Sequence, residues 1–441
     1  MTIIPQLAAA LQDVFNIIAY SLGRSSGFVQ REGKLNGASF VQTLLFSFLA
    51  NPDATGAELT QTAAALGVSI SEPGLTQRFT PQAAALLQQV LAAAIKRVLA
   101  AEPLESALLE RFSALYLEDS SVILLPEQLR ELWPGCGNAQ ERGTASLKLC
   151  LRLDLRSGRL DGLTLTPGRT ADLRAAAPLS SIEPGALYLA DLGFFKLARL
   201  SKLAKQGGLF LSRLSVQNTL FTADAQRWDD LAELLATHSQ TPVDLPVELG
   251  ASERLELRLL AVRAPQEVVD VRRRRIRAEA ARRGRTPSAR QLALAQWTIL
   301  VTNVPSEVLS VEAALILARV RWQIELVFKR WKSQGKLDSS RSEQVWRVLC
   351  ELYAKLLALL VQHWVSLISL WGYRDRSLSK AIKVVQKYAL SLAEWLWDSK
   401  QVCEILARMA RVQELSCRMG RRGQRPHTYQ LLLEVGEHLL A

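Results

Sequence analysis

Cysteine and histidine are scarce in this chain of 441 residues, which holds five of the first and four of the second. No two cysteines form a C-x-x-C pair, and no two histidines form an H-x-x-x-H pattern. These absences argue against a zinc site, a disulfide framework and a histidine-ligated metal ion, because each of those needs ligands at short, regular spacing. We therefore expect a protein of a reducing compartment.

The chain also lacks a long uninterrupted apolar run. Its most apolar segment, Leu356–Trp371, contains Gln362 and His363 and falls short of the roughly 18 to 20 residues that span a bilayer. The first residues have neither the basic start nor the small-residue cleavage site of a signal peptide. We expect Leu356–Trp371 to be a buried core helix and the protein to be cytoplasmic, with no membrane partner.

Acidic residues are outnumbered by basic ones. Lys and Arg total 54 against 42 Asp and Glu, which gives a formal net charge of +12. This excess favours a polyanionic partner, of which DNA and RNA are the commonest. An ordinary enzyme that happens to be basic is the alternative.

Arginine is concentrated in one stretch. Nine arginines lie between Arg272 and Arg290, and the run is densest at its start, which comprises Arg272, Arg273, Arg274 and Arg275. We expect these side chains to contact DNA phosphates with an affinity that falls steeply with salt. The alternative is a solvated helix face. A second, weaker basic cluster spans Arg421–His427.

Residues 1 to 105 are rich in Ala and Leu, which predicts helices. Within them, Ala57–Ser69 has the pattern of a helix that ends in Leu-Gly and is followed by a second helix, as in a helix-turn-helix unit. The side chains of Thr76–Phe79, Arg78 among them, would then face DNA. A plain helical bundle is the alternative.

From residue 111 the pattern changes to that of a mixed α/β sheet. A strand is predicted over 115–125, ending near Asp119, and a hairpin over 147–155 and 160–166. A short apolar strand then ends on Asp191, followed by a helix over about 194–206 and a strand over 209–214. Residues 216 to 305 contain further strands, over 247–249, 255–262 and 296–303. From Ser310 a helix is expected to run through Glu325 to about Lys332.

Three acids stand out by their placement: Asp119 and Asp191 at strand ends, and Glu325 on a helix whose inward face is apolar. Hard divalent cations prefer carboxylate oxygens and water, and two such ions can activate a nucleophile and stabilise the leaving oxygen of a phosphodiester. Three carboxylates from distant segments are the minimal set that can hold them. Three other acids could take these roles on composition alone: Glu118, Asp154 and Asp161.

The sequence around the three acids resembles one family. Asp119–Pro126, Leu189–Phe195 and Arg321–Lys329 are similar, in this order, to the three motifs of the bacterial DDE transposases of the insertion-sequence-four group. The resemblance covers roughly residues 40 to 395. It implies an RNase H-like catalytic core interrupted by a β-rich insertion between the second and third acids, with a helical N-terminal domain, and thus an α/β fold class.

The resemblance also implies roles for single residues. Asp119, Asp191 and Glu325 would be the catalytic and metal-binding acids, with Mg²⁺ as cofactor and Mn²⁺ able to substitute. The family has a Tyr-Arg-Glu-Lys signature around the glutamate, in which Arg321 and Lys332 match and would hold DNA phosphates. The alternative is an exposed ion pair between Arg321 and Glu325. Ala318 stands where the family has its tyrosine.

Two tryptophans, Trp297 and Trp322, match residues that handle a flipped base in relatives. Indole is suited to stacking on a displaced base. A tryptophan within a strand is otherwise a core residue, and this remains the alternative for Trp297.

We interpret the chain as a DDE transposase that cleaves DNA strands and transfers them, and the resemblance implies a cut-and-paste route with a hairpin on the transposon end. Its partners would be the double-stranded DNA of the terminal inverted repeats and of the target, bound by a homodimer. Two alternatives are a structure-specific nuclease on the same core and a catalytically impaired DNA-binding relative, which Ala318 favours. The expected segments are a helical N-terminal domain for DNA binding or pairing (1–105), the two parts of the core (106–215 and 306–395), the insertion (216–305) and a helical C-terminal region (396–441).

Overall fold

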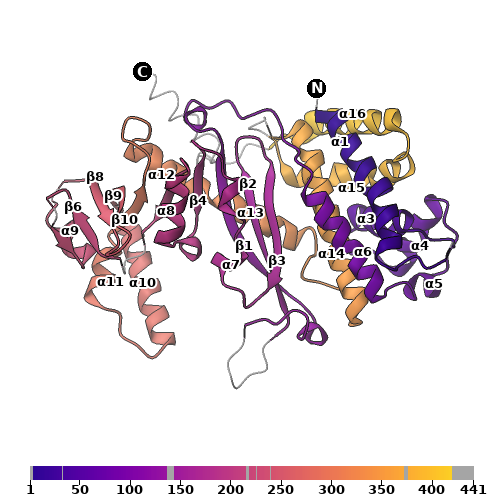
Figure 1. Cartoon of the computed structure of the whole chain (residues 1–441), viewed down its shortest axis with the longest axis horizontal. Helices are drawn as coiled ribbons and strands as arrows, with labels where there is room; N and C mark the ends of the chain where they lie inside the picture. Colours follow the sequence, from indigo (N-terminus) through magenta and orange to yellow (C-terminus); the bar gives the residue numbers. More distant parts are fainter. Residues whose placement is uncertain are drawn as a thin grey trace. The chain divides into compact units, whose positions relative to one another are not determined.

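The computed structural model describes residues 3–31, 33–136, 144–214, 218–224, 226–238, 240–371 and 376–419. The basic cluster Arg421–His427 lies outside them, as does the rest of the C-terminal region beyond residue 419. The chain divides into two compact units (Figure 1). Of these described residues, those within 3–105, 120–177 and 323–419 form unit 1, and those within 106–119 and 178–322 form unit 2.

Unit 1 is mainly helical. Its N-terminal helices are α1 (Ile3–Gln12), the π-helix η1 (Asp13–Ile18), α2 (Ala19–Ser25), α3 (Gly37–Ala50), α4 (Gly56–Ala65), α5 (Glu72–Thr76) and α6 (Pro81–Ile95). Its later helices are α13 (Trp322–Ser333, which begins at the last residue of unit 2), α14 (Val345–Ser369), α15 (Leu378–Glu394) and α16 (Ser399–Ser416). Capping boxes start α3 and α4, where Asn36 pairs with Ser39 and Thr55 with Glu58.

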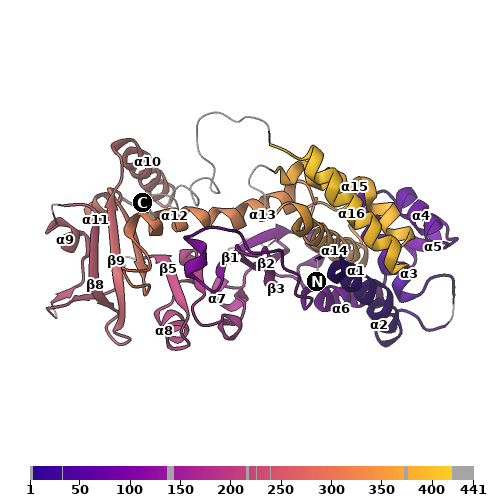
Figure 2. The same cartoon turned by 90° about the horizontal axis from the view of Figure 1, so that it is seen from above.

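Helix α14 is the centre of unit 1. It packs against α3 and α6, and α15 and α16 lie side by side next to it (Figure 2). Every residue from Val348 to Val361 is buried, and all of them except Glu351 and Lys355 are apolar. The expected core helix over Leu356–Trp371 is thus confirmed.

By length and composition alone, two helical stretches of the described chain could cross a membrane: Ile3–Ser25 and Val345–Ser369. The apolar window of the second is 89% buried inside the structure and that of the first 39%. Core helices pass the same test, so this is weak evidence for a membrane.

The expected helix-turn-helix is only partly present. Helix α4 is followed by α5, which has five residues, too few for a recognition helix. Phe79 was expected to face DNA and this is wrong, because its ring is buried against Phe40, with 6.2 Å between ring centroids, and under the guanidinium of Arg347. Arg78, in the turn after α5, is exposed.

Unit 1 also contains the expected hairpin. Strands β2 (Ser146–Asp154) and β3 (Leu160–Pro167) pair antiparallel, and the strand order here is β3-β2-β1, β1 (Leu115–Leu124) contributing its second half. The hairpin turn contacts α14, since His363 Nε2 lies 2.7 Å from the carbonyl oxygen of Gly158 and the indole of Trp371 donates to that of Leu155 at 3.0 Å. The short helix α7 (Asp172–Ala175) follows the hairpin.

Unit 2 is a mixed sheet with helices. In order across the sheet, its strands are the first half of β1, β4 (Leu187–Ala190), β5 (Leu209–Arg213), β10 (Trp297–Thr302), β9 (Leu255–Arg263), β8 (Val243–Leu249), β6 (Leu220–Thr222) and β7 (Arg227–Trp228). Strands β1, β4 and β5 are parallel and the others antiparallel. The helices of unit 2 are α8 (Leu197–Lys205), α9 (Leu231–Ala236), α10 (Gln266–Arg282), α11 (Ala289–Leu294) and α12 (Val311–Val320).

Short 3-10 turns complete the elements: η2 (Leu109–Arg111), η3 (Glu127–Leu129), η4 (Leu179–Ser181) and η5 (Leu192–Phe194). The mixed α/β class is thus confirmed, with ten strands in the described residues.

Two expected boundaries are wrong. The first strand spans Leu115–Leu124, close to the expected 115–125, but it does not end near Asp119. The acid lies inside β1, because Val122, Ile123 and Leu124 favour a strand and the second half of β1 has a place in the sheet beside β2. The single helix expected from Ser310 to Lys332 is divided at Arg321 into α12 and α13. Ser310 does cap the first of them, as expected, by accepting from the amide of Ala313 at 3.2 Å.

Candidate active site

Asp119 and Asp191 occupy matching positions on adjacent parallel strands. The register pairs Glu118 of β1 with Ala190 of β4, so the next residue on each strand is an aspartate. Asp191 has the extended angles φ −78° and ψ 169° and thus continues the direction of β4. Neighbouring strands lie about 4.8 Å apart, and matched residues of parallel strands point to the same face. The register of unit 2 therefore brings the backbones of these two aspartates to the same level of neighbouring segments.

The surroundings of the two aspartates differ. Asp119 is 17% exposed and accepts from Nη1 of Arg321, 3.5 Å from its Oδ2. Within the described part of the chain, the Asp191 side chain makes no hydrogen bond or ion pair. Sequence reasoning assigned Arg321 to a phosphate, and the structure shows that it also contacts a carboxylate.

Glu325 and Lys332 lie on α13, in unit 1. Glu325 is partly buried, and the apolar inward face expected of its helix is confirmed on α13, where Ile324 and Phe328 are buried. The Lys332 ammonium donates to the carbonyl oxygen of Val122 at 2.6 Å, and its partial burial lowers its pKa. Among the described residues, no three His, Cys, Asp or Glu gather closely enough to hold a metal ion. The strand register brings Asp119 and Asp191 to the same level, and the metal-binding role of all three acids stays a prediction from their motifs.

The acids that competed for these roles have structural partners. Asp161 pairs with the fully buried Arg152, whose Nη2 is 2.7 Å from its Oδ2. Asp154 accepts from the Ser157 hydroxyl and from the amide of Arg156 within the hairpin turn. These contacts give both acids a structural role in the folding of the hairpin.

Glu118 is the third competitor, and sequence reasoning missed its role. It is fully buried and accepts from the Tyr188 hydroxyl and from Nη2 of Arg199, which lies 3.1 Å from its Oε2. Burial, and then the nearby charge of Glu118, raise the pKa of Tyr188 well above its usual value, so its hydroxyl remains a donor. The alternation of side chains along a strand could have indicated this, because Glu118 and its neighbour Asp119 must face opposite sides of the sheet.

Trp297 begins β10 and is partly buried, while Trp322 begins α13 and is 55% exposed. The Arg263 guanidinium lies over the Trp297 ring, 4.7 Å from its centroid, in a cation–π contact. Trp297 is thus neither a plain core residue nor an uncovered stacking surface.

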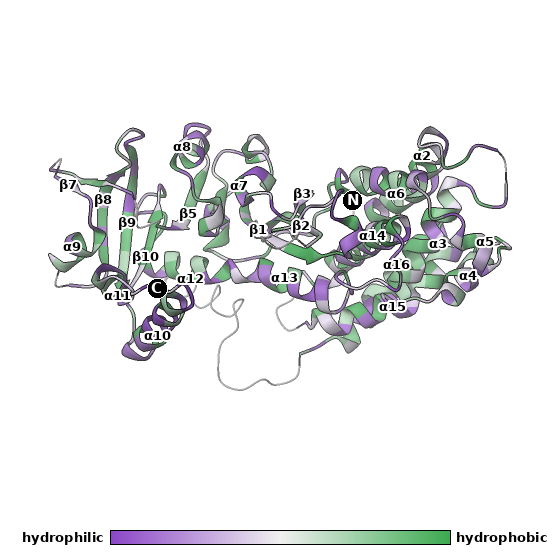
Figure 3. Cartoon of the chain, turned by 90° about the horizontal axis from the view of Figure 1, so that it is seen from below, coloured by the Kyte–Doolittle hydropathy of each residue, from purple (hydrophilic) through white to green (hydrophobic). Residues whose placement is uncertain are grey.

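The arginine run forms most of α10, a strongly hydrophilic helix (Figure 3). Its first two arginines point to protein carbonyls: Arg272 Nη1 donates to Trp297 at 2.8 Å, and Arg273 Nε to Leu292 at 3.2 Å. Burial, and then the charge of Arg213, lower the pKa of Arg272. By contrast Arg274, Arg275, Arg277 and Arg282, on the outer face of α10, and Arg285, beyond its end, are exposed and have no ion pair within the described chain.

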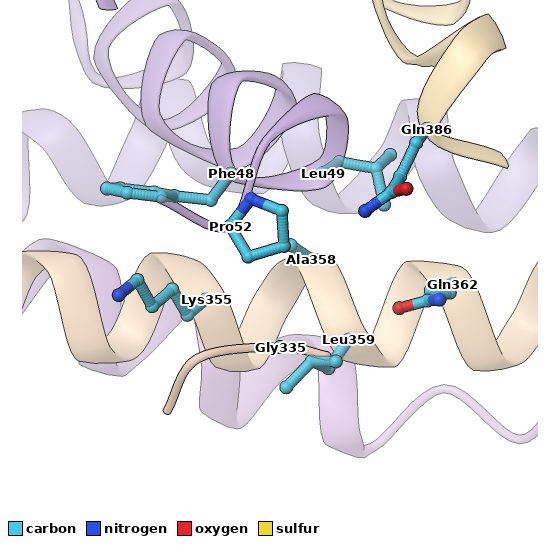
Figure 4. A pocket seen from close by; sticks show the side chains of 9 residues that line it. All are labelled: Phe48, Leu49, Pro52, Gly335, Lys355, Ala358, Leu359, Gln362 and Gln386. Atoms are coloured by element: carbon cyan, nitrogen blue, oxygen red, sulfur yellow. The ribbon is translucent and has the colours of Figure 1, made fainter. Parts of the chain in front are cut away.

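A small pocket in unit 1 lies between α3 and α14 (Figure 4). Its polar side chains come from Lys355, Gln362 and Gln386, and no acid lines it. Lys355 is buried and donates to the carbonyls of Lys336 at 3.0 Å and Ser339 at 2.7 Å, so its ammonium stabilises the loop before α14. This pocket has no donor set for phosphodiester chemistry.

Known proteins similar to this chain indicate the family to which it belongs. A family model for the transposase DDE domain matches residues 113–361, which include all three candidate acids. The transposase for insertion sequence element IS231C of Bacillus thuringiensis subsp. berliner is 26% identical over 443 residues, covering 95% of this chain and 92% of that protein. That for IS231F of Bacillus thuringiensis subsp. israelensis is 24% identical over 442 residues, with the same two coverages of 95% and 92%. That for IS1151 of Clostridium perfringens is 24% identical over 392 residues, covering 80% of this chain and 79% of that protein.

Proposed function

Because the chain belongs to the transposase DDE domain family, we propose that it moves an insertion sequence by metal-dependent cleavage and joining of DNA, with Asp119, Asp191 and Glu325 as metal ligands. The chain is a transposase and therefore an enzyme that acts on DNA, and its relatives are transposases of insertion sequences. DDE transposases use divalent metal ions. The cut-and-paste route, the choice of Mg²⁺ and the roles of single residues are our proposal.

The observation that carries the proposal is the register of β1 and β4. It places Asp119 and Asp191 at one level of two adjacent strands, where their oxygens can share one hard cation. Carboxylate donors without cysteine or histidine fit Mg²⁺, and fit Mn²⁺ as a substitute. When bound, the metal supplies a Lewis acid and an activated oxygen nucleophile. Glu325 is proposed as the third ligand from its motif alone.

Arg321 contributes charge beside the first acid. Its guanidinium has five donors in a planar fork, so it can contact Asp119 and still offer N–H groups to a phosphate. Lys332 would present its ammonium to a second phosphate, as a point charge, once it leaves the Val122 carbonyl. Ala318, partly exposed on α12, supplies no hydroxyl to this phosphate grip.

Further contacts to DNA are proposed from the surface of the chain. Trp297 and Trp322 would stack on displaced bases, Trp322 being the more exposed. The arginines of α10 and Arg78 would contact phosphates. Within α10, Arg272 and Arg273 would serve mainly to hold the helix against the protein. We also propose that the protein is cytoplasmic and acts as a homodimer on the terminal repeats and the target DNA. Its core, residues 106–215 and 306–395, would be RNase H-like and would surround a β-rich insertion.

The test is a plasmid that carries the element's own terminal repeats, incubated with the protein and Mg²⁺. Excised and reinserted fragments are expected, and Asp119→Asn, Asp191→Asn and Glu325→Gln should each abolish them. Nicks without joining would favour the structure-specific nuclease. A gel shift without cleavage, unchanged by Asp119→Asn, would favour the impaired relative. Arg319→Met, on the exposed side of α12, is the control variant that should leave cleavage unchanged.

A further inference from the structure

Three polar side chains meet behind the candidate aspartates, and we call them the positioning network: Glu118, Tyr188 and Arg199. Glu118 accepts from the Tyr188 hydroxyl and from Arg199 Nη2, which is 3.1 Å from Glu118 and 3.5 Å from the Tyr188 oxygen. Glu118 has no exposed surface. Since consecutive residues of a strand face opposite sides, the network lies on the side of the sheet opposite to Asp119.

The network is tied to both aspartates through the chain. Glu118 immediately precedes Asp119 on β1, and Tyr188 lies three residues before Asp191 on β4. Arg199 follows Asp191 by eight residues, on α8, so its ion pair closes the turn that begins at Asp191 onto β1. Each segment that carries an aspartate is therefore fixed at this one point.

We propose that Glu118, Tyr188 and Arg199 are positioning residues, which hold β1 and β4 in the register that sets Asp119 beside Asp191 for shared metal binding. The role rests on the proposed function, because it assumes that the two aspartates bind metal. The Tyr188–Glu118 contact is diagonal, since Tyr188 is paired with Tyr116 and Glu118 with Ala190. A slip of one residue would turn Glu118 to the other face and leave its charge without these two donors.

The chemistry of the network favours this role over simple stabilisation. A buried ion pair often contributes no more stability than well-packed apolar residues of similar size. Apolar side chains would tolerate neighbouring registers, whereas these directional hydrogen bonds are satisfied in one. The network thus selects an alignment of the strands.

The chain offers a matched pair of variants. Tyr188→Phe removes the hydroxyl that binds Glu118. Tyr116→Phe removes the hydroxyl of an equally buried tyrosine, the paired residue of β1, which donates to Glu183 at 2.7 Å. The double variant Glu118→Leu/Arg199→Met removes both charges together, so no buried charge is left unpaired.

The experiment is a Mn²⁺ titration of the full-length chain followed by electron paramagnetic resonance, with thermal melting as a check of folding. Tyr188→Phe and the double variant should weaken Mn²⁺ binding roughly tenfold, the scale of effects seen when groups behind metal ligands are changed. Tyr116→Phe should bind Mn²⁺ like wild type. Hydrogen exchange at Leu187–Ala190 should be faster in the double variant and unchanged in Tyr116→Phe.

Two results would overturn the inference in distinguishable ways. If wild type binds Mn²⁺, Asp119→Asn loses it, and Tyr188→Phe and the double variant bind within twofold of wild type, the positioning role alone is wrong. If Asp119→Asn binds Mn²⁺ as wild type does, the proposed metal site is wrong and the positioning role falls with it.

Discussion

Arg321 and Asp119, which are 202 residues apart in sequence, meet at 3.5 Å between Nη1 and Oδ2. Both side chains are largely buried, at 16% and 17% exposure, so their attraction is screened less than that of a surface pair. A cation beside a candidate metal ligand opposes the binding of a second cation. The same guanidinium suits a phosphate, so we expect Arg321 to favour the binding of DNA rather than the binding of metal.

Arg321→Met is therefore expected to bind Mn²⁺ at least as tightly as wild type while cleaving DNA roughly 10- to 100-fold more slowly, the effect of losing one charged hydrogen bond. The measurements are a Mn²⁺ titration and the initial rate of plasmid cleavage. Arg319→Met is the control, since Arg319 is exposed at the end of the same helix. Weaker Mn²⁺ binding in Arg321→Met would contradict this account.

The arginines of α10 should separate into two classes. Arg274→Ala/Arg275→Ala/Arg277→Ala is expected to leave the melting temperature unchanged and to weaken binding to a random-sequence duplex. The slope of the logarithm of its binding constant against the logarithm of the salt concentration should become shallower by up to about 2.7, or about 0.9 for each phosphate that is no longer neutralised. Arg272→Ala should instead lower the melting temperature, because its guanidinium bonds the Trp297 carbonyl and the Thr298 hydroxyl. Equal salt slopes in wild type and the triple variant would exclude the outer face of α10 from DNA.

His363 should make the stability of unit 1 depend on pH. Burial lowers its pKa to about 4, from about 6.5 in an unfolded chain. The unfolded state then takes up the proton first as pH falls. The free energy of unfolding should decrease between pH 6.5 and about 4, by at most about 1.4 kcal/mol per pH unit, and this contribution is fully present above pH 6.5.

The control for His363 is His363→Gln, which keeps a donor near the Gly158 carbonyl but cannot titrate. Urea unfolding at several pH values should show a wild-type decline in this window that the variant lacks. Parallel curves for the two proteins would show that another group governs acid sensitivity.

Two glycines with positive φ allow the effect of backbone strain to be measured apart from the effect of side-chain crowding. Gly67 (φ 76°) has nothing within 4 Å of an added Cβ, whereas at Gly158 (φ 71°) that atom would lie 2.5 Å from the side chains of Leu367 and Trp371. Gly67→Ala should cost about 1 to 2 kcal/mol of unfolding free energy from strain alone. Gly158→Ala should cost clearly more, as measured by urea unfolding, because the turn must also move away from α14. Equal losses would mean that the turn shifts without resistance.

Much of the fold followed from local pattern. The hairpin of β2 and β3, strand β4 and the apolar helix α14 were predicted because alternation, Gly-containing turns and apolar runs determine each of them locally. The strand through Asp119 has nearly its predicted length, but its expected end near the acid was wrong, because β1 continues past Asp119 to a place beside β2 in the sheet. Such pairing comes from residues far away in sequence.

The site was only partly predictable for the same reason. Motifs identified Asp119 and Asp191, but no local pattern reveals that Arg321 reaches Asp119 or that Arg199 reaches Glu118, because these contacts join segments 202 and 81 residues apart. Arg272 shows the opposite case. Its place in a basic run indicated DNA, and no local pattern reveals that its guanidinium donates to carbonyls of the protein.

The helical unit is assembled from the two ends of the chain, and this has a consequence for its synthesis. Helices α3 and α6 leave the ribosome early, yet α14, which covers them, is made some 250 residues after α6. The carbonyl of Leu396 is likewise held by Gln12 and Asn16, at 3.0 and 3.2 Å. A nascent or truncated polypeptide that stops before α14 therefore exposes apolar surfaces to chaperones and proteases.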